Sequence, residues 1–280
     1  MLLNPVYVDD LCRRALLEDM NYIDITTDYL IPEQQTATAR LMAKDDGVLC
    51  GVSVAQRVFE LLDPTFRAEI FKKDGETLKK GDIIAEFTGN ARCLLKGERT
   101  ALNLIQHMSG VATATRRAVE LVQGTKASVT DTRKTLPGMR PLEKYAVTTG
   151  GGKNHRYNLS DAALIKDNHI DASDGISNAV HILRKRVGHM AKIEVEARNL
   201  DELREALRAG ADTIMLDNMT PFLMRQAVEI NAGRAVLEAS GGITMENLRE
   251  VAETGVDIIS LGFLTHSVKA FDISMKIVSK

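Results

Sequence analysis

From residue 125 onward the chain alternates short apolar runs with helix-like segments, and this rhythm limits its fold more than any other feature. The apolar runs are ASVTD (127–131), AALIK (162–166), KIEVE (192–196), TIMLD (213–217), AVLEAS (235–240) and DIISLG (257–262). After Glu196 the run ends recur about every 20 residues, the length of one βα unit. Serial βα units form either a parallel barrel or a doubly wound sheet.

The helix-like segments between the later runs carry start and stop signals. NLDELREALRAG and TMENLREVAETG each have a capping residue in front, Asn199 or Thr244, and a glycine behind, Gly210 or Gly255. A short polar side chain at the start and a glycine at the end are typical of helix caps. The sequence therefore predicts a helix after each of these two apolar runs.

The residues that end the apolar runs suggest where a site lies. They are Asp131, Lys166, Glu196, Asp217, Ser240 and Gly262. In a βα barrel the carboxyl ends of the strands open onto one face, and that face carries the active site. A single polar strand end indicates no more than a strand that leaves the sheet at the surface. Four ionisable ends and two ends at glycine-containing loops favour an active site.

The first 93 residues have a different pattern, typical of a small α+β domain. Strand-like runs cover residues 36–44, 47–51, 66–71 and 82–89, with a helix-like VSVAQRVFELL among them. Asn4 and Pro5 provide the cap and first position of an N-terminal helix. A long helical pattern over 94–124 then connects this region to the βα repeat.

Composition excludes several classes of function. Aromatic residues are 4% of the 280, Trp is absent and the net charge is -2, so base-stacking and polyanion binding are disfavoured. No apolar run approaches the roughly 18 residues of a membrane span. Cys12, Cys50 and Cys93 form no C-x-x-C pair, which argues against structural zinc and disulfides. We expect a soluble cytoplasmic protein that binds neither nucleic acid nor membrane.

Residues 131–156 form a local excess of positive charge. The segment has six Lys or Arg and two acids, hence +4, in a chain of -2. Such a cluster on a mildly acidic protein suggests a pocket for a small anion. We expect Arg140 and Lys144 to lie on a solvated helix face. The pocket would draw on side chains just past a strand end and a helix end, namely Arg133, Lys134, His155 and Arg156.

Two glycine-containing motifs have different interpretations. GGGKNHR (150–156) lacks the spacing of a phosphate loop and follows a helix. Its glycines either stop that helix or let backbone approach a ligand. In EASGGIT (238–244), Gly241 and Gly242 follow a strand and precede a helix, a geometry that presents backbone N–H groups to an anion.

Glu196 and Asp217 would be acids at neighbouring strand ends opposite these cations. They could serve Mg²⁺ bound to substrate phosphates, stabilise an oxocarbenium-like ribose, or form salt bridges without a catalytic role. Lys166 at another strand end would also suit a Schiff-base enzyme, although the arginine cluster argues against that chemistry. A non-catalytic sensor of an anionic metabolite is a further alternative.

The motifs taken together resemble the quinolinate phosphoribosyltransferase family. The resemblance is carried, in the family's order, by LLKGERTALNLIQHMSGVAT, DTRKTLPGMRPLEKYAVTTGGGKNHR, LSDAALIKDNHI, IEVE, MLDN, ASGGI and SLGFLTHS. These motifs cover nearly the whole chain. Arg133, His155 and Arg156 favour this family over its paralogues from molybdenum-transport loci, and over nicotinate-specific relatives that bind one carboxylate.

The resemblance implies an α/β fold with two domains. An N-terminal α/β sandwich domain would span residues 1–105 and be completed by residues 268–280, and an incomplete α/β barrel would span 106–267. The implied reaction joins quinolinate and phosphoribosyl pyrophosphate (PRPP), with Mg²⁺, to give nicotinate mononucleotide, pyrophosphate and CO₂ in de novo NAD synthesis.

The resemblance also implies site residues. Arg133, His155, Arg156 and Lys166 would hold quinolinate, with Arg99 from a partner subunit. Lys134 would lie between the two substrates, and Glu196 and Asp217 would hold the ribose and, indirectly through PRPP, the metal. The remaining substrate-binding positions are Thr132, Ser240, Gly241, Gly242, Ser260 and Gly262.

The shared site would require a homodimer or a higher oligomer such as a hexamer. The catalytic residues implied are Lys134, Lys166, Glu196 and Asp217. Which of the two lysines assists decarboxylation is left open.

Overall fold

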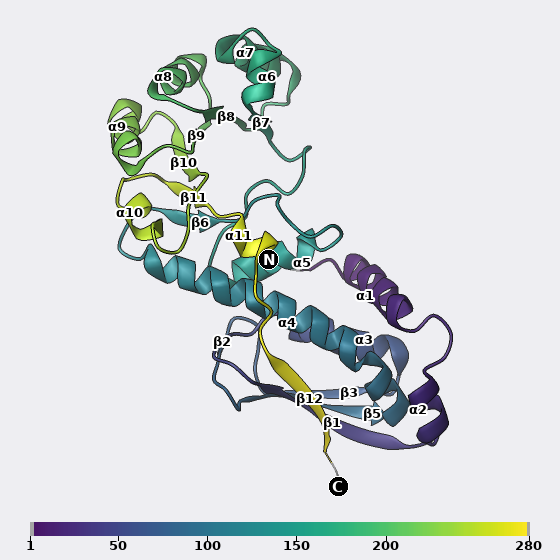
Figure 1. Ribbon diagram of the computed structural model, residues 1–280. Helices are drawn as coiled ribbons and strands as arrows, with labels where there is room; N and C mark the ends of the chain where they lie inside the picture. Colours follow the sequence, from purple (N-terminus) through teal and green to yellow (C-terminus); the bar gives the residue numbers. More distant parts are fainter. Residues whose placement is uncertain (1–2, 279–280) are drawn as a thin grey trace. The chain divides into compact units, whose positions relative to one another are not determined.

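A computed structural model describes residues 3–278, and its internal contacts form two compact units (Figure 1). The first unit holds the chain up to Arg116, residues Leu136–Gly151 and the segment from Ser267. The second unit holds Arg117–Thr135 and Gly152–His266. The chain therefore passes between the units more than once.

The first unit is built on a four-stranded antiparallel sheet. Its strand order is β12-β1-β5-β3, with β1 (Thr36–Ala43), β3 (Arg67–Ile70), β5 (Ile83–Asn90) and β12 (Ile273–Val278). A second ladder pairs β2 (Gly47–Val48) with β4 (Thr77–Leu78). Figure 1 shows β12, the last strand of the chain, returning beside β1.

The first unit also contains helices. They are α1 (Pro5–Asp19), α2 (Ile25–Leu30), α3 (Val52–Leu62), α5 (Arg140–Gly150) and most of α4 (Ala91–Leu121). As the sequence predicts, Asn4 caps α1, since its side chain accepts the Val6 N–H at 3.0 Å.

The core of the first unit is centred on three phenylalanines. The ring of Phe59 on α3 lies 5.4 Å from that of Phe66 and 5.2 Å from that of Phe87 on β5, measured between centroids. Gly97 allows α4 to pack closely here, because a Cβ at this position would lie 2.8 Å from the Phe59 ring. Aromatic burial and edge or offset ring contacts stabilise such a cluster.

Helix α5 belongs to the first unit, which differs from the expected domain bounds. Glu143 on α5 bonds His107 on α4 at 2.8 Å, and Tyr145 donates to Asp74 at 2.9 Å. The expected first domain was 1–105 with 268–280. The first unit also includes residues 106–116 of α4, the α5 segment 136–151 and Ser267, so the second unit is smaller than the expected 106–267. Residues 1–2 and 279–280 of those ranges lie outside the described residues.

The second unit contains a six-stranded parallel sheet in the order β6-β11-β10-β9-β8-β7. The strands are β6 (Ser128–Thr130), β7 (Ala163–Ile165), β8 (Ile193–Ala197), β9 (Thr213–Asp217), β10 (Val236–Ser240) and β11 (Ile258–Ser260). Each falls on one of the six apolar runs. The expected α/β class, an incomplete barrel with an N-terminal α/β sandwich domain, is confirmed.

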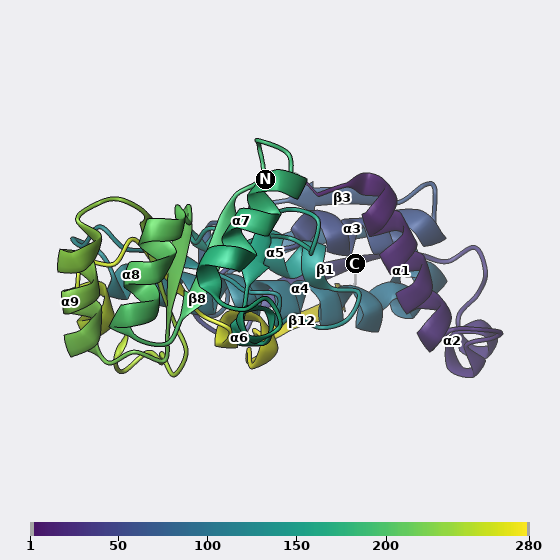
Figure 2. The same ribbon diagram turned by 90° about the horizontal axis from the view of Figure 1, so that it is seen from above.

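The helices of the second unit connect and cover these strands. They are α6 (Asp167–Asp171), α7 (Ile176–Arg186), α8 (Leu200–Ala209), α9 (Pro221–Asn231), α10 (Leu248–Ala252) and α11 (Phe263–His266). Figure 2 shows α8 and α9 side by side.

The barrel stays open between β6 and β7. The helix that comes between these strands in sequence, α5, belongs to the first unit. Residues after α5 extend along β6 instead, where Thr130 forms a parallel bridge with Lys153. This edge segment carries the GGGKNHR motif, so its last residues reach the carboxyl ends of the strands.

Two of the four cap residues expected in the second half hold, and two do not: α10 ends before Gly255, with Glu253 at its C-cap. Asn199 caps α8 and Gly210 ends it in the left-handed conformation with φ 77°. The expectation for Thr244 is wrong, because α10 starts only at Leu248, with Asn247 at the cap position. The Asn247 side chain accepts the Thr244 N–H at 2.8 Å, which holds residues 244–247 in a turn rather than a helix.

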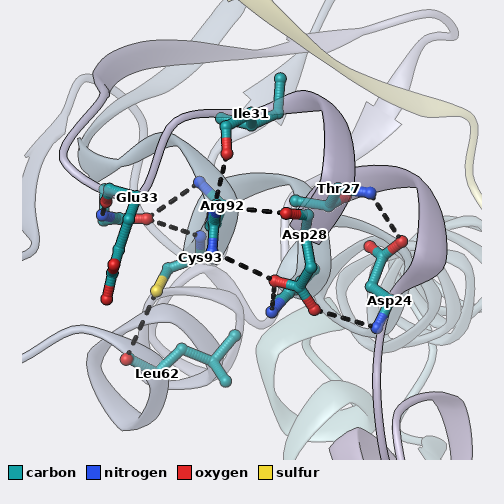
Figure 3. A network of polar contacts seen from close by, with 10 residues as sticks. Asp24, Thr27, Asp28, Ile31, Glu33, Leu62, Arg92 and Cys93 are labelled. Atoms are coloured by element: carbon teal, nitrogen blue, oxygen red, sulfur yellow. Dashed lines mark hydrogen bonds and ion pairs between the residues drawn. The ribbon is translucent and has the colours of Figure 1, made fainter.

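A polar network holds α2 against α4 in the first unit (Figure 3). The Arg92 guanidinium donates to the backbone oxygens of Ile31 at 2.8 Å and Asp28 at 3.1 Å. Lys96 also donates to the Asp28 side chain. Arg92 and Lys96 are one turn apart, so they share a face of α4.

Within the described residues, 3–278, the helices are too short or too polar to cross a membrane.

We expect Phe59→Ala to lower the free energy of unfolding by about 3–5 kcal/mol, because it removes a fully buried ring and leaves a cavity. Urea unfolding followed by circular dichroism measures this. Phe222→Ala, at a ring that is 64% exposed, is the control and should change stability by about 0.5 kcal/mol or less. Equal effects of the two substitutions would contradict the assigned core.

Candidate active site

The carboxyl ends of the parallel strands surround a cavity of about 500 Å³ in the second unit. Such a volume accommodates a small molecule. The cavity is lined by Thr132, Arg133, Lys134, His155, Arg156, Leu164, Lys166, Glu196, Met215, Asp217, Asn218, Glu238, Ser240, Gly241, Gly242 and Ser260. Four of the six residues that end the apolar runs therefore line one cavity: Lys166, Glu196, Asp217 and Ser240.

All but two of the residues expected in the site line this cavity. Gly262 lies behind the wall, where a Cβ would approach the Lys134 side chain to 3.1 Å. Arg99 is on α4 in the first unit and is exposed. It follows Arg92 and Lys96 on the helix face that holds α2, but unlike them it has no ion pair or hydrogen bond among residues 3–278.

Two guanidinium groups approach one another on the cavity wall. The pKa of Arg156 is lowered first by burial and then by the positive charge of Arg133. Its Nη1 donates to the Ala162 oxygen at 2.8 Å, while its Nε is buried with no acceptor in the described chain. A partly buried guanidinium that lacks an acceptor at its buried Nε and lies beside a second cation is suited to an anionic ligand.

The cavity also contains two acids and a lysine, namely Glu196, Asp217 and Lys166. Lys166 Nζ lies 3.5 Å from Glu196 Oε2. Burial raises the pKa of Glu196, the Lys166 ammonium opposes this effect, and the charge of Asp217 adds to it. Two carboxylates close together and partly buried attract a positive charge.

Local structure fixes the position of Lys166. Its backbone N–H donates to His169 Nδ1 at 3.0 Å, which caps α6. His169 thus acts on the backbone at this strand end.

The SGG turn after β10 has the geometry of an anion cradle. Gly241 and Gly242 both have left-handed φ, at 87° and 63°. A side chain at 241 would also collide with Asn218, whose Oδ1 would lie 2.3 Å from the added Cβ. Only glycine fits at this position, and the backbone N–H groups of such turns face outward toward an anion.

The GGGKNHR motif acts as a helix end followed by a cavity wall. Helix α5 ends at Gly150 and Gly151 caps it with φ 100°, which confirms the helix-stop interpretation. Asp131, buried at the end of β6, accepts the His155 N–H at 2.9 Å. That bond directs His155 and Arg156 into the barrel.

Two buried acids at the floor of the site were missed from the sequence. Glu194 on β8 and Glu238 on β10 face His155, whose Nε2 lies 3.1 Å from Glu194 Oε2 and 3.6 Å from Glu238 Oε2. Residues two apart on a strand share a face. The spacing of Glu194 to Glu196, and of Glu238 to Ser240, was therefore a signal for both.

The expectation of a solvated face for Lys144 is wrong, because Lys144 is fully buried on α5. The helix buries Leu142, Glu143, Ala146 and Val147 as well, so this side is packed rather than solvated. Of the six cations in 131–156, the ones that line the cavity are Arg133, Lys134 and Arg156.

Family models match both parts of the chain. The model described as "Quinolinate phosphoribosyl transferase, N-terminal domain" matches residues 24–109, and "Quinolinate phosphoribosyl transferase, C-terminal domain" matches residues 111–276. The chain belongs to the quinolinate phosphoribosyl transferase family.

Individual relatives agree with this assignment. The chain is 46% identical to the probable nicotinate-nucleotide pyrophosphorylase [carboxylating] of Bacillus subtilis, over 98% of this chain and 95% of that protein. It is 40% identical to the chloroplastic nicotinate-nucleotide pyrophosphorylase [carboxylating] of Arabidopsis thaliana, over 98% and 84%. The crystal structure of NadC from Streptococcus pyogenes superposes with TM-score 0.96 at 42% identity, covering 100% of both chains.

We expect Lys166→Met to raise the pKa of Glu196 further, because it removes the ammonium that favours the carboxylate. Carboxyl ¹³C chemical shifts followed through a pH titration measure this. Lys192→Met, which removes an exposed ammonium near Asp212 instead, is the control. An unchanged Glu196 titration in Lys166→Met would refute the electrostatic coupling.

Proposed function

We propose that this chain transfers the phosphoribosyl group of PRPP to quinolinate with decarboxylation, giving nicotinate mononucleotide, pyrophosphate and CO₂ in de novo NAD synthesis. The observation that carries the proposal is the half-buried Arg156 side chain, whose buried Nε has no acceptor among residues 3–278 and which has a second guanidinium, Arg133, beside it. A pyridine ring with two adjacent carboxylates supplies two negative charges to this wall.

The quinolinate carboxylates would be held by Arg133, Arg156 and Lys166, because arginine forks bind carboxylates through paired hydrogen bonds. His155 would form the adjoining wall and position Arg156, whose backbone N–H it accepts at Nδ1 at 2.8 Å. Thr132 supports the same loop, since its hydroxyl accepts the Lys134 N–H at 3.0 Å. Lys134 would then lie between quinolinate and PRPP.

Ribosyl transfer would take place between the acids and the ring. The quinolinate nitrogen would displace pyrophosphate at C1 of the ribose through an oxocarbenium-like state flanked by Glu196 and Asp217, whose negative charge stabilises the developing cation. The 5′-phosphate would bind the SGG turn, Ser260 and the backbone near Gly262. Decarboxylation would follow, because the cationic ring nitrogen stabilises the electron pair left on the neighbouring carbon.

Mg²⁺ would accompany PRPP rather than occupy a site made by the protein alone. The donor set fits: Glu196 and Asp217 are partly buried carboxylates in the cavity, and hard cations bind oxygen ligands of this kind, often through phosphates and water. When bound, the ion neutralises charge on the pyrophosphate. The acids would orient the ribose and act on the metal indirectly.

Arg99 would complete the quinolinate pocket of a second copy, which makes the active form a homodimer or a higher oligomer. Its exposure and its lack of a partner among residues 3–278 support this role. We also propose a cytoplasmic location, supported by the three free thiols of Cys12, Cys50 and Cys93.

The decisive assay follows ¹⁴CO₂ from quinolinate labelled in the 2-carboxylate. We expect release that requires PRPP and Mg²⁺ and that yields nicotinate mononucleotide in equal amount. No release with both substrates present would overturn the function. A sensor that binds without turnover would give no product, and a Schiff-base enzyme would instead be trapped at Lys166 by borohydride with a carbonyl substrate.

We expect Arg156→Lys to raise KM for quinolinate by about 10–100-fold, the equivalent of one or two charge-assisted hydrogen bonds. KM for PRPP should stay within a factor of about two. Steady-state kinetics with each substrate varied in turn measure this. Arg184→Lys, at an exposed ion pair with Asp212, is the matched control. Equal changes for both substrates would contradict the assignment of Arg156 to the ring carboxylates.

We expect Arg99→Ala and Glu196→Ala each to lower kcat/KM by about 100-fold or more. If Arg99 acts in the partner's site, mixed oligomers of the two inactive variants contain some sites with both residues intact. Refolding or subunit exchange of a mixture should therefore restore activity, measured against each variant alone. A mixture as inactive as its parts would contradict the shared site.

A further inference from the structure

We propose that Glu238 is the acid that protonates the ring carbon from which CO₂ departs, with Glu194 and His155 holding it in place. This inference rests on the proposed function. It concerns one step to which no residue has yet been assigned, the delivery of the proton that replaces CO₂ on the ring.

Glu238 is placed between the reacting cavity and the barrel interior. It lies on the central strand β10, is 2% exposed, and lines the main cavity. Its Oε2 is 3.6 Å from His155 Nε2, and its Oε1 is buried with no hydrogen-bond partner within residues 3–278. Glu194 Oε1 is in the same condition. Two carboxyl groups thus face one imidazole N–H, and each keeps a buried oxygen that receives no hydrogen bond within residues 3–278.

The hydrogen on His155 can be placed from its contacts. Nδ1 accepts the Arg156 backbone N–H at 2.8 Å, so the ring hydrogen is on Nε2, which faces the two acids. The imidazole therefore donates one hydrogen to the pair, and the shorter distance, 3.1 Å, directs it to Glu194. At 3.6 Å, Glu238 has only a weaker contact with the same N–H.

A carboxylate oxygen of Glu194 lies within 4.8 Å of one of Glu238, and a like charge at this distance disfavours the ionised form of Glu238. Burial, followed by the charge of Glu194, raises the pKa of Glu238 to about 7. The other groups that face it are His155 and the Ser260 hydroxyl, with Arg156 and Arg133 farther along the wall. Glu238 is thus the member of the pair that carries the proton.

The same three side chains lie close enough together to surround a metal ion. The His155 tautomer argues against that occupant, because a metal at Nε2 would need a lone pair where the hydrogen sits, while Nδ1 already uses its own lone pair. A shared proton satisfies the contacts and a metal ion does not.

A second cavity provides a route for replacing the proton. It has a volume of about 100 Å³, and Glu238 and His155 line it as well as the main one. Its other walls are Ser128, Thr130, Lys153, Asn154 and Ile258. This volume has room for ordered water. Glu238 can therefore receive a proton from one side and deliver it on the other.

The step balances as follows. The bond between C2 of the ring and its carboxylate breaks, CO₂ leaves, and the electron pair stays on C2 beside the cationic ring nitrogen. The O–H bond of Glu238 then breaks as the C2–H bond forms, which leaves a carboxylate. Until this proton arrives the carbanion can recombine with the CO₂ still beside it, so net CO₂ release depends on the proton transfer. Water from the interior cavity returns one proton to the Glu238 carboxylate per turnover. Lysine is a poorer candidate for this acid, since Lys166 is half exposed and paired with Glu196.

The test is Glu238→Gln, which keeps shape and removes the transferable proton. We expect pyrophosphate release within about threefold of the unsubstituted enzyme and ¹⁴CO₂ release slowed by about 100-fold, the scale of general acid catalysis. Quinolinate mononucleotide should accumulate. Glu229→Gln, at an exposed position on α9, is the control and should release both products normally.

The outcomes separate this inference from the proposed function. If the unsubstituted enzyme releases no CO₂, the function fails. If it does, and Glu238→Gln releases CO₂ equally fast, Glu238 is not the acid and a lysine or water takes its place. Loss of both products in a folded variant also overturns the proposal, because it would place Glu238 in ribosyl transfer.

A second measurement does not depend on the variant folding. Decarboxylation of preformed quinolinate mononucleotide by the unsubstituted enzyme should be fast below the pKa of Glu238 and should fall as pH rises through about 7, since only the protonated acid donates. A rate that stays flat to about pH 9 would overturn the proposal.

Discussion

The six strands of the second unit run parallel, so their carboxyl ends face one side and the side chains that follow them must share one small volume. Everything in the site follows from this constraint. The cations of the 131–156 segment and the acids of β8 and β9 would be costly to bury separately. At this edge they face one cavity, where the arginine wall requires an anion and the acid pair requires a positive charge. Substrates that carry negative charge toward the arginines and develop positive charge beside the acids satisfy both groups.

The rhythm of apolar runs was sufficient to place all six parallel strands, and the run ends marked four residues of the cavity lining, Lys166, Glu196, Asp217 and Ser240. The other lining residues that were expected came from the cationic segment, the SGG motif and the family resemblance. Other features depend on packing that a linear pattern does not show. Lys144 has the spacing of a surface residue and is buried, and α5 joins the first unit through contacts with α4. Glu194 and Glu238 look like ordinary strand residues until β8 and β10 place both against His155.

The acids at the floor and the arginines on the wall have complementary roles in the proposed reaction. Quinolinate arrives with two negative charges, and Arg133 and Arg156 compensate for them. CO₂ leaves without charge, so one of these negative charges stays on the ring carbon until a neutral Glu238 supplies a proton and itself becomes a carboxylate. His155 joins the two layers, because it accepts from the backbone of Arg156 at one nitrogen and donates toward the acids at the other.

The most direct test of the central claim is equilibrium binding of two ring acids in the absence of PRPP. Isothermal titration calorimetry compares pyridine-2,3-dicarboxylate with pyridine-3-carboxylate. If the excess positive charge of the wall selects the ligand, the dicarboxylate should bind at least about tenfold more tightly, the equivalent of one charge-assisted hydrogen bond, and the difference should shrink in Arg156→Lys. Equal affinities for the two acids would contradict the account.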